Sequence, residues 1–536
     1  MKKNISWMYL YILTLMSIGG LLASCTDNSD NTPTPPAEGY TIEVGESMTM
    51  PENEFVTKIP ATNDYDPEVV KALEATENIT DVKPFKLVHA FDFIQQKFIT
   101  KTAYYFNYKQ YIDHENPSKG WFKQQCVLSV AGKDRPTVLH TEGYNLNHSG
   151  TNRLDSIFEP TLVSVLEANC LQVEYRYHGW SLPEGYTNKF NYLNCKQQSD
   201  DLHAIVTTIK NSGIISKSSK WVATGVSKSG MTTAHYAYHH PNDMDAYVPF
   251  CAPFLTSLSD QGPPSYILTP EALGGRQQVW QSLKDAFRTY VSDKSLQAEC
   301  LKLAKKDYPQ QFGSGDDEKL RIELLKMLFE NYYRKMSYVK LQLWQSLIPK
   351  AGDGAERYIK FIMSDQNTRY DDESGDEYER RQDFNDAMDD LKSGSTPLFL
   401  TRSGEPVKRH DPYSVQTCID LGNFAISLEW IKDLLTDAEK NSLIEIGDPA
   451  YYGVKYDDGK FIREFLDGMK QSDCNMCFVY GMQDPWTGGR IPDDKLGKNS
   501  QILYIENGTH NDAIETYNSS ERNQLFQWLH GLGFDL

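Results

Sequence analysis

Between about residues 84 and 180, short apolar runs are separated by clusters of turn residues. Apolar runs of this length, rich in aromatic and β-branched side chains, are typical of β-strands. The two later runs carry few charges, as the buried strands of a parallel sheet do. The predicted strands cover residues 103–114, 123–130, 136–143 and 170–179.

The next part of the chain alternates between helical and strand-like patterns. Residues 195–212 place apolar side chains at helical spacing, with Leu202, Ile205 and Ile209 on one face. A strand is predicted over residues 220–225, and a helix over 231–241 that ends at Pro241. Alternation of this kind indicates an α/β fold with a parallel sheet.

The pattern changes again after about residue 265. Long, charged helical runs without strands fill residues 270–395, which indicates a helical insertion. From about residue 411 a mixed pattern returns, with strands predicted at 476–481 and at the start of 500–510, before His510, and a last helix at 519–533.

The N-terminus has the features of an export signal. Lys2 and Lys3 precede an apolar run over residues 7–24, and the tetrapeptide LASC resembles the cleavage site of bacterial lipoproteins. Residues 1–24 are therefore predicted to be a lipoprotein signal peptide, with Cys25 as the lipid-modified residue. An ordinary signal peptide or an uncleaved anchor is the alternative.

Residues 25–40 are rich in Pro, Thr and Asp and predict a flexible tether. A lipid on Cys25 would hold the protein on a membrane with its body in water. We therefore expect a lipoprotein of the bacterial cell envelope, at the outer membrane, on either its periplasmic or its surface face.

Composition excludes one class of partner and leaves others open. The chain has 536 residues, of which 40% are hydrophobic, and a formal net charge of −19. This charge argues against nucleic-acid binding, since no basic excess is present to neutralise phosphates. The pair Cys474 and Cys477 has no second pair and no histidine cluster beside it, so a structural role is favoured over a zinc or redox site. No metal or organic cofactor is predicted, and the oligomeric state stays open.

The segment GVSKSG, residues 225–230, lies between a predicted strand and a predicted helix. A nucleophilic serine on such a turn takes strained backbone angles and needs small neighbours two residues away. Ser227 would be the nucleophile, with Gly225 and Ser229 as the small neighbours. The alternative is a polar residue that caps a helix.

Two later residues complete a possible catalytic triad. Asp484 and His510 each follow a predicted strand, and an α/β-hydrolase supplies its three residues in the order Ser, Asp, His. Ser227 would attack a carbonyl, His510 would move the proton, and Asp484 would orient the imidazole. The amide of Lys228 would be one oxyanion donor, and the amide of Gly143 or Tyr144 the second.

We therefore predict an α/β-hydrolase fold with a large helical cap inserted between nucleophile and acid. Its first part would cover residues 41–265, the cap residues 266–410, and its second part residues 411–536. The cap would cover the site as a lid.

The chain also resembles the secreted prolyl tri- and tetrapeptidyl aminopeptidases, serine peptidases of α/β-hydrolase fold, and more distantly the lysosomal Pro-Xaa carboxypeptidase family. Similar segments run in the family's order from about residue 84 to 510, and include RPTVLHTEGY, VEYRYHGWSLP, WVATGVSKSGMTTAHYAYHHP and YGMQDPW. The resemblance places the family's nucleophile, acid and base on Ser227, Asp484 and His510. The chain departs from the family at Ser229, where glycine is usual, and around Asp420–Phe424.

An aminopeptidase must bind a free ammonium near its nucleophile, which requires a carboxylate. Glu142 and Asp420 are the candidates, although either could instead hold a loop by hydrogen bonds. Trp180 and Trp486 could contact a proline, or could pack in the core.

The sequence thus predicts a lipid-anchored serine exopeptidase that acts on peptide substrates and releases tripeptide-type N-terminal fragments, with a preference for proline. A carboxyl esterase on the same fold, or a non-catalytic lipoprotein that binds peptides or glycans, are the alternatives.

Overall fold

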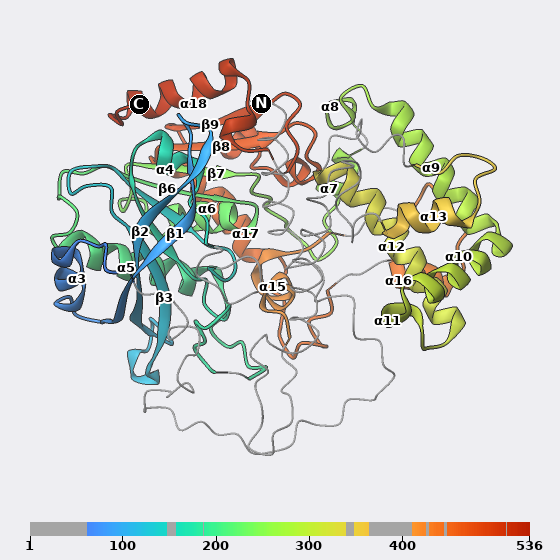
Figure 1. Ribbon diagram of the computed structural model, residues 1–536, viewed down its shortest axis with the longest axis horizontal. Coiled ribbons are helices and arrows are strands. Elements are labelled where there is room, and N and C mark those ends of the chain that lie inside the picture. Colours follow the sequence, from blue (N-terminus) through green and yellow to red (C-terminus); the bar gives the residue numbers. More distant parts are fainter. Residues whose placement is uncertain are drawn as a thin grey trace.

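A mostly parallel sheet forms the centre of the larger part of the molecule in the computed structural model (Figure 1). Its nine strands in the described part of the chain run in the order β1-β2-β3-β5-β4-β6-β7-β8-β9. Strands β1, β2, β3 and β5 pair antiparallel, and every pairing from β5 onward is parallel. The bounds are β1 (Ile79–Asp92), β2 (Lys97–Tyr111), β3 (Trp121–Ser129), β4 (Thr137–Thr141), β5 (Asn169–Val173), β6 (Trp221–Val226), β7 (Ala246–Phe250), β8 (Met476–Gly481) and β9 (Ser500–Ile505).

The structure describes residues 62–146, 157–185, 187–267, 269–338, 348–363, 410–424, 428–443, 447–510 and 512–536. The predicted signal peptide, Cys25 and the tether lie outside these residues. Within the described part, each helix is either too short or too polar to cross a bilayer.

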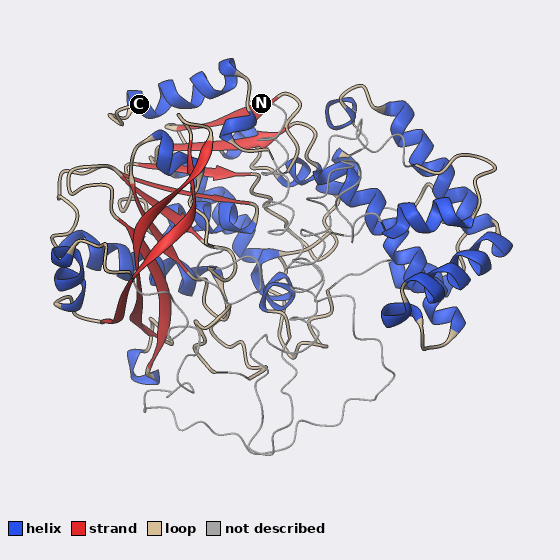
Figure 2. Cartoon of the chain, viewed as in Figure 1, coloured by secondary structure: helices blue, strands red, loops and turns tan. Residues whose placement is uncertain are grey.

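Helices cover both faces of the sheet (Figures 1 and 2). Helices α5 (Cys195–Asn211), α6 (Lys228–His239) and α17 (Lys460–Gln471) pack on one face, and α4 (Thr161–Val165) and α18 (Ser519–Gly531) on the other. Successive side chains of a strand point to opposite faces. In β4, Val138 therefore joins the α4 and α18 side while Leu139 joins the α5 and α6 side. Apolar side chains on both faces explain why these strands read as continuous hydrophobic runs.

A separate group of helices stands beside the sheet and has a hydrophobic core of its own (Figure 2). This core holds buried side chains such as Phe287, Tyr358 and Ile431, none of which belongs to the clusters on the sheet faces. The helices of the group are α9 (Gln277–Ser292), α10 (Lys294–Asp307), α12 (Asp317–Tyr338), α13 (Ala355–Ile362) and α16 (Asp437–Leu443). The described residues also form short helices, which include α3 (Pro67–Glu74), α7 (Gly262–Tyr266), α8 (Pro270–Leu273), α11 (Pro309–Phe312) and α15 (Pro412–Gln416).

The core of the helical group includes residues beyond 410, where the cap was predicted to end. Leu428, Ile431, Leu435 and Leu443 lie in the core of the helical group, although they belong to the stretch predicted as hydrolase domain. Arg288 of α9 donates a hydrogen bond to the carbonyl of Trp430 and fixes this stretch there. Among the described residues, the segment 410–424 also contacts the sheet domain, through Asp420 and Val415.

The eight cysteines that follow Cys25 are buried free thiols. Cys474 donates to the carbonyls of Ala237 and Pro241, and Cys477 accepts from Gln501. The two side chains belong to clusters on opposite faces of the sheet. This placement agrees with the structural role that the sequence favoured for the pair.

A buried ion pair ties the antiparallel edge of the sheet to α5. Arg176, at the end of β5, donates through Nε and Nη2 to both carboxylate oxygens of Asp201, at 2.8 and 2.6 Å. Both side chains are completely buried, and His114 and Gln124 also bond to Asp201. Two parallel charge-assisted bonds fix the orientation of both groups.

We predict that Asp201→Asn destabilises the fold by about 3–5 kcal/mol, because it leaves the buried guanidinium without a counter-charge. Denaturant unfolding of the two proteins measures the difference. Lys123→Met, which breaks the half-exposed pair between Lys123 and Asp81, is the control and should change the free energy of unfolding by at most about 1 kcal/mol. Equal losses for the two variants would contradict the prediction.

Candidate active site

Ser227 occupies the sharp turn between β6 and α6. Its backbone angles are φ 59° and ψ −122°, a region that residues other than glycine rarely enter. The amide of Ser227 donates to the carbonyl of Phe250 in β7, and its own carbonyl accepts from Met231 in the first turn of α6. The surrounding structure therefore holds a strained serine, and Ser227 makes no capping hydrogen bond with its side chain.

Close packing around the turn explains which neighbours must be small. A Cβ on Gly225 would lie 2.5 Å from the carbonyl oxygen of Ser229 and 2.7 Å from its Cβ. A Cβ on Gly230 would lie 2.4 Å from the carbonyl oxygen of Phe250. The one Cβ of Ser229 fits because Gly225 has none. The departure from glycine at residue 229 is thus compatible with the nucleophile turn.

Asp484 and His510 form a buried hydrogen-bonded pair. Nδ1 of His510 lies 2.8 Å from Oδ2 of Asp484, whose other oxygen accepts from the amide of Trp486 at 3.0 Å. Asp484 is fully buried and His510 nearly so. A proton on Nδ1 shared with the carboxylate leaves Nε2 as the acceptor, which is the tautomer that a general base needs.

The parallel sheet brings the three loops together at one edge. Ser227, Asp484 and His510 follow β6, β8 and β9, which with β7 are neighbours in the sheet and end on the same side. Hydrogen bonds between the loops fix this arrangement, from the amide of Cys251 to Val479 and from that of Gln483 to Gly508. The predicted triad residues therefore share the carboxyl edge of the sheet, where open α/β folds build their sites.

The predicted oxyanion loop lies against the nucleophile turn. A Cβ on Gly143 would be only 2.8 Å from the amide nitrogen of Ser229 and 3.0 Å from Cβ of Lys228, so the two segments touch. Lys228 is the first residue of α6, and the amide of a first helical residue has no partner within the helix. This amide suits an oxyanion, which the helix dipole also favours.

Two features of the site were not predicted. The side chain of Lys228 is buried, and burial lowers its pKa to about 7 although Asp411, Cys195 and Asp420 oppose the shift. The thiol of Cys251 lies beside Asp484 and His510, and burial together with Asp484 raises its pKa well above the usual range. Sequence gave no sign of either, because only the fold shows that a lysine after the nucleophile points inward.

The two carboxylates predicted to bind an ammonium already have partners within the protein. Glu142 lies 3.0 Å from Nδ1 of His140. Burial disfavours the charged imidazole of His140, but Glu142 outweighs this effect and raises its pKa. Asp420 accepts from the amide of Cys195 at 2.7 Å, at the start of α5, and burial raises its pKa to about 6. The Asp420 contact fits the alternative in which the carboxylate holds a loop, whereas the ion pair of Glu142 joins two residues of the same segment.

The two tryptophans lie in different surroundings. Trp486 follows Asp484 directly, and its ring is 5.9 Å from that of His510 and in edge contact with Phe424 at 4.6 Å. Trp180 packs against a cluster of the antiparallel strands that contains Phe85 and Tyr105. The structure thus brings Trp486, but not Trp180, next to the acid and base.

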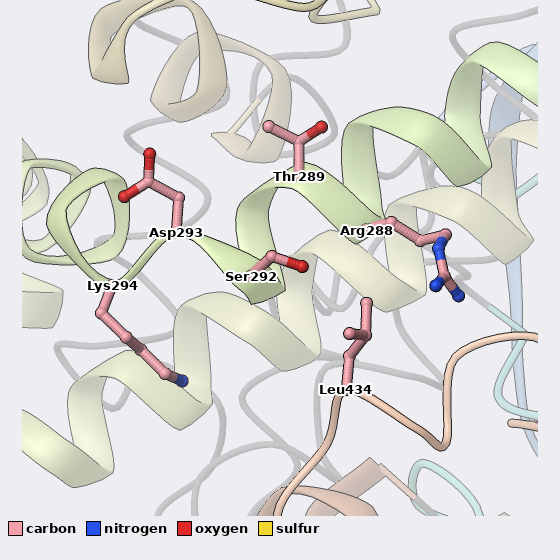
Figure 3. Close-up of a pocket in the computed structure, with 6 residues that line it drawn as sticks. All are labelled: Arg288, Thr289, Ser292, Asp293, Lys294 and Leu434. Carbon is pink, nitrogen blue, oxygen red and sulfur yellow. The ribbon is translucent and has the colours of Figure 1, made fainter.

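A cavity of about 680 Å³ opens in the helical group, away from these residues (Figure 3). It lies where α9 joins α10, and Asp293 there caps α10 by accepting from two of its amides. The lining residues are Arg288, Thr289, Ser292, Asp293, Lys294 and Leu434, and none of them belongs to the predicted site.

Two groups in the described residues have three potential metal-binding side chains. One is Cys251 with Asp484 and His510, the predicted acid and base. The other is His203, His240 and Asp243. The two imidazole rings of this group stack at 4.2 Å and 9°, so their in-plane lone pairs run parallel and do not converge on one ion.

Comparisons with known proteins agree with this geometry. Residues 75–261 match the family described as PS-10 peptidase S37. Over 425 residues, 77% of this chain and 76% of the relative, the sequence is 27% identical to the prolyl tri/tetrapeptidyl aminopeptidase of Streptomyces mobaraensis.

Among solved structures, proline iminopeptidase of Mycobacterium smegmatis is similar at a TM-score of 0.34 and 12% identity, covering 76% of this chain and 95% of that one. The esterase LipA of Xanthomonas oryzae is similar at 0.35 and 10%, covering 85% and 100%. Likenesses this weak add nothing to the fold assignment, which rests on the strand order and on the turn at Ser227.

We predict that Gly230→Ala lowers stability by about 1–3 kcal/mol and prevents labelling of Ser227 by a fluorophosphonate, because the new Cβ meets the carbonyl of Phe250. Ser229→Gly should cost about 1 kcal/mol or less and keep the labelling. Denaturant unfolding and mass spectrometry of the labelled protein measure both. A Gly230→Ala variant that is stable and still labelled would contradict the prediction that the turn has no space for a Cβ at residue 230.

Proposed function

We propose that the chain is a serine exopeptidase that releases short, tripeptide-type fragments from the N-terminus of peptides, with a preference for proline. The match of residues 75–261 to the PS-10 peptidase S37 family supports the peptidase class. The observation that carries the proposal is the hydrogen bond between Asp484 and His510 at the same sheet edge as the strained Ser227. The name of the Streptomyces relative supplies the substrate class.

In this proposal Ser227 attacks the carbonyl carbon of the scissile bond and forms a tetrahedral oxyanion. His510 accepts the hydroxyl proton at Nε2 and delivers it to the leaving amine, while Asp484 stabilises the imidazolium. The acyl-enzyme is then hydrolysed by water, which His510 activates in the same way. The amide of Lys228 and that of Tyr144 or Gly143 donate to the oxyanion.

The substrate would lie between the nucleophile and the segment that returns from the helical group. Phe424 belongs to this segment and contacts Trp486, whose ring lies near His510. We propose that Trp486 forms the apolar wall for a proline ring, since aromatic faces pack well against it. The ammonium of the substrate would be bound by Glu142 or Asp420 once its internal partner shifts.

We further propose that the protein is exported and anchored by a lipid on Cys25 in the bacterial cell envelope, at the outer membrane. The support is the signal-like run before Cys25 and the Pro- and Thr-rich stretch after it. An acylated terminus on a tether would let the peptidase reach peptides close to the membrane.

A carboxyl esterase is the second candidate, because the same triad and oxyanion donors hydrolyse esters. A peptide-binding lipoprotein without activity is a third. The buried bond between Asp484 and His510 favours an enzyme over this third candidate, since a binding protein has no use for a fixed imidazole tautomer.

We predict that Ser227→Ala lowers peptide release by roughly four to six orders of magnitude, as removal of a triad nucleophile does elsewhere. Asp484→Asn should lower kcat by about four orders, because the wrong imidazole tautomer is then favoured. The soluble domain is incubated with a mixed peptide pool, with half of the peptides acetylated at the N-terminus, and mass spectrometry identifies the fragments.

Each outcome of this assay selects one candidate. Tripeptide-type fragments from free peptides alone support the exopeptidase. Cleavage of simple esters without peptide release identifies an esterase. Near-normal release by Ser227→Ala, or a folded protein whose Ser227 resists fluorophosphonate, would count against the proposed triad.

We predict that Cys25→Ser moves the protein from the membrane fraction to the soluble fraction of its host, because no acyl chain is then attached. Cell fractionation and mass spectrometry of the N-terminal peptide measure the change. Cys126→Ser, at a buried thiol in the sheet, is the control and should stay with the membrane. Membrane retention of Cys25→Ser would contradict the lipid anchor.

A further inference from the structure

The side chain of Lys228 turns away from the predicted oxyanion and inward, toward the loop that follows β4. Its Nζ donates to the carbonyl oxygen of Gly143 at 2.5 Å and lies 3.2 Å from Nε2 of His178. The side chain is 2% exposed. A lysine is almost never buried to this extent unless its charge has a purpose or a partner.

The partners around Nζ come from four segments of the chain. Three tyrosine rings face the ammonium, with centroids at 3.9 Å for Tyr175, 5.0 Å for Tyr144 and 5.6 Å for Tyr413. Rings at such distances stabilise a cation through their quadrupoles. The titratable and charged groups that face Lys228 are His178, Asp411, Asp420 and Cys195 together with these three tyrosines.

The carbonyl of Gly143 and the amide of Tyr144 belong to one peptide group. A trans peptide is planar, and its C=O and N–H point in opposite directions. The described residues contain no cis peptide bond. A donor that holds the Gly143 oxygen therefore also fixes the direction of the Tyr144 N–H, which is one of the two predicted candidates for the second oxyanion donor.

We propose that Lys228 is a positioning residue that serves both donors of the oxyanion hole: its own amide is the first, and its ammonium orients and polarises the peptide that carries the second, the amide of Tyr144. The inference rests on the proposed acyl-transfer function and selects Tyr144 over Gly143. A positive charge beside the carbonyl oxygen, here the Lys228 ammonium, draws electron density from the peptide group and makes its N–H a stronger donor.

Neighbouring contacts fix the loop at its other points. The carbonyl of Tyr144 accepts from the amide of Tyr175, and the backbone of Gly143 touches Ser229. The amide of Leu146 donates to Glu174, a buried carboxylate that also accepts from Trp180 and Ser181. The peptide between Gly143 and Tyr144 is thus held on both sides, and its own carbonyl is held by Lys228.

The charge of Lys228 makes this device sensitive to pH. Burial lowers the pKa of Lys228 to about 7, so the ammonium loses its proton as the pH rises through neutrality. The neutral amine polarises the Gly143 carbonyl less than the ammonium does. Activity should therefore fall on the alkaline side as Lys228 loses its proton.

The first test compares Lys228→Met with the wild-type protein on a peptide and on an activated ester. We expect kcat to fall about 10- to 100-fold on both substrates, less than the loss of a whole oxyanion donor, with KM changed less than about 2-fold. Lys210→Met is the matched control: Lys210 is half-buried, lies over Trp221 and donates to a backbone carbonyl, but belongs to the far end of α5. It should leave kcat unchanged.

The second test uses the pH profile of kcat and remains informative if Lys228→Met does not fold. Asp411→Asn removes a negative charge that favours the ammonium, and Asn can still cap α15 in place of Asp411. We expect the alkaline limb of the wild-type profile near pH 7 to move to lower pH in Asp411→Asn and to stay in place in Lys210→Met.

A kcat of Lys228→Met within 2-fold of wild type, or a wild-type profile that is flat from pH 7 to 9, would overturn the proposal. The ester separates this failure from failure of the proposed function. If the wild-type protein hydrolyses the ester but releases no peptides, the substrate assignment is wrong, while both tests of Lys228 are still decided on the ester.

Discussion

The geometry of the site depends on the backbone of Ser227, which a tight turn holds in a conformation that residues other than glycine rarely adopt. The turn has almost no spare space, because a Cβ added to Gly225 or to Gly230 would lie 2.5 or 2.4 Å from a carbonyl oxygen. Strain of this kind costs of order 1–3 kcal/mol and persists only where the surroundings impose it. Here the hydrogen bond from Ser227 to Phe250 and the packing of β6 between β4 and β7 impose it. The same turn places Lys228 at the start of α6, with its side chain buried in the interior.

The sequence predicted the fold well where a pattern is repeated. The strand at 476–481 has the bounds of β8, and the helix at 195–212 agrees with α5 within one residue, because both elements bury a continuous apolar face. The α/β-hydrolase fold, the serine peptidase class and the family resemblance are confirmed. Leu428 and Ile431 lie beyond the predicted end of the cap and still pack in the helical group, because their burial depends on a core formed by distant helices.

Candidate site residues were predictable only so far as chain order carries information. Order and strand ends predicted Asp484 and His510, and the structure shows their hydrogen bond. Chain order could not distinguish Trp180 from Trp486 as a site residue, since both follow predicted strands. Packing in the fold places Trp486 beside His510. Chain order also missed the side chain of Lys228, because the direction of a side chain at the start of a helix depends on the four segments that enclose it.

The buried cysteines have a consequence for how the protein reaches its folded state. In the native structure the eight thiols after Cys25 are buried, six of them on the two faces of the sheet or in the helical group, and buried thiols are chemically inert. In the proposed export route the chain would enter an oxidising compartment unfolded, with these thiols exposed. Folding would then compete with the formation of wrong disulfides. The thiols would be protected from oxidation only after the sheet has formed and buried Cys126, Cys170 and Cys477.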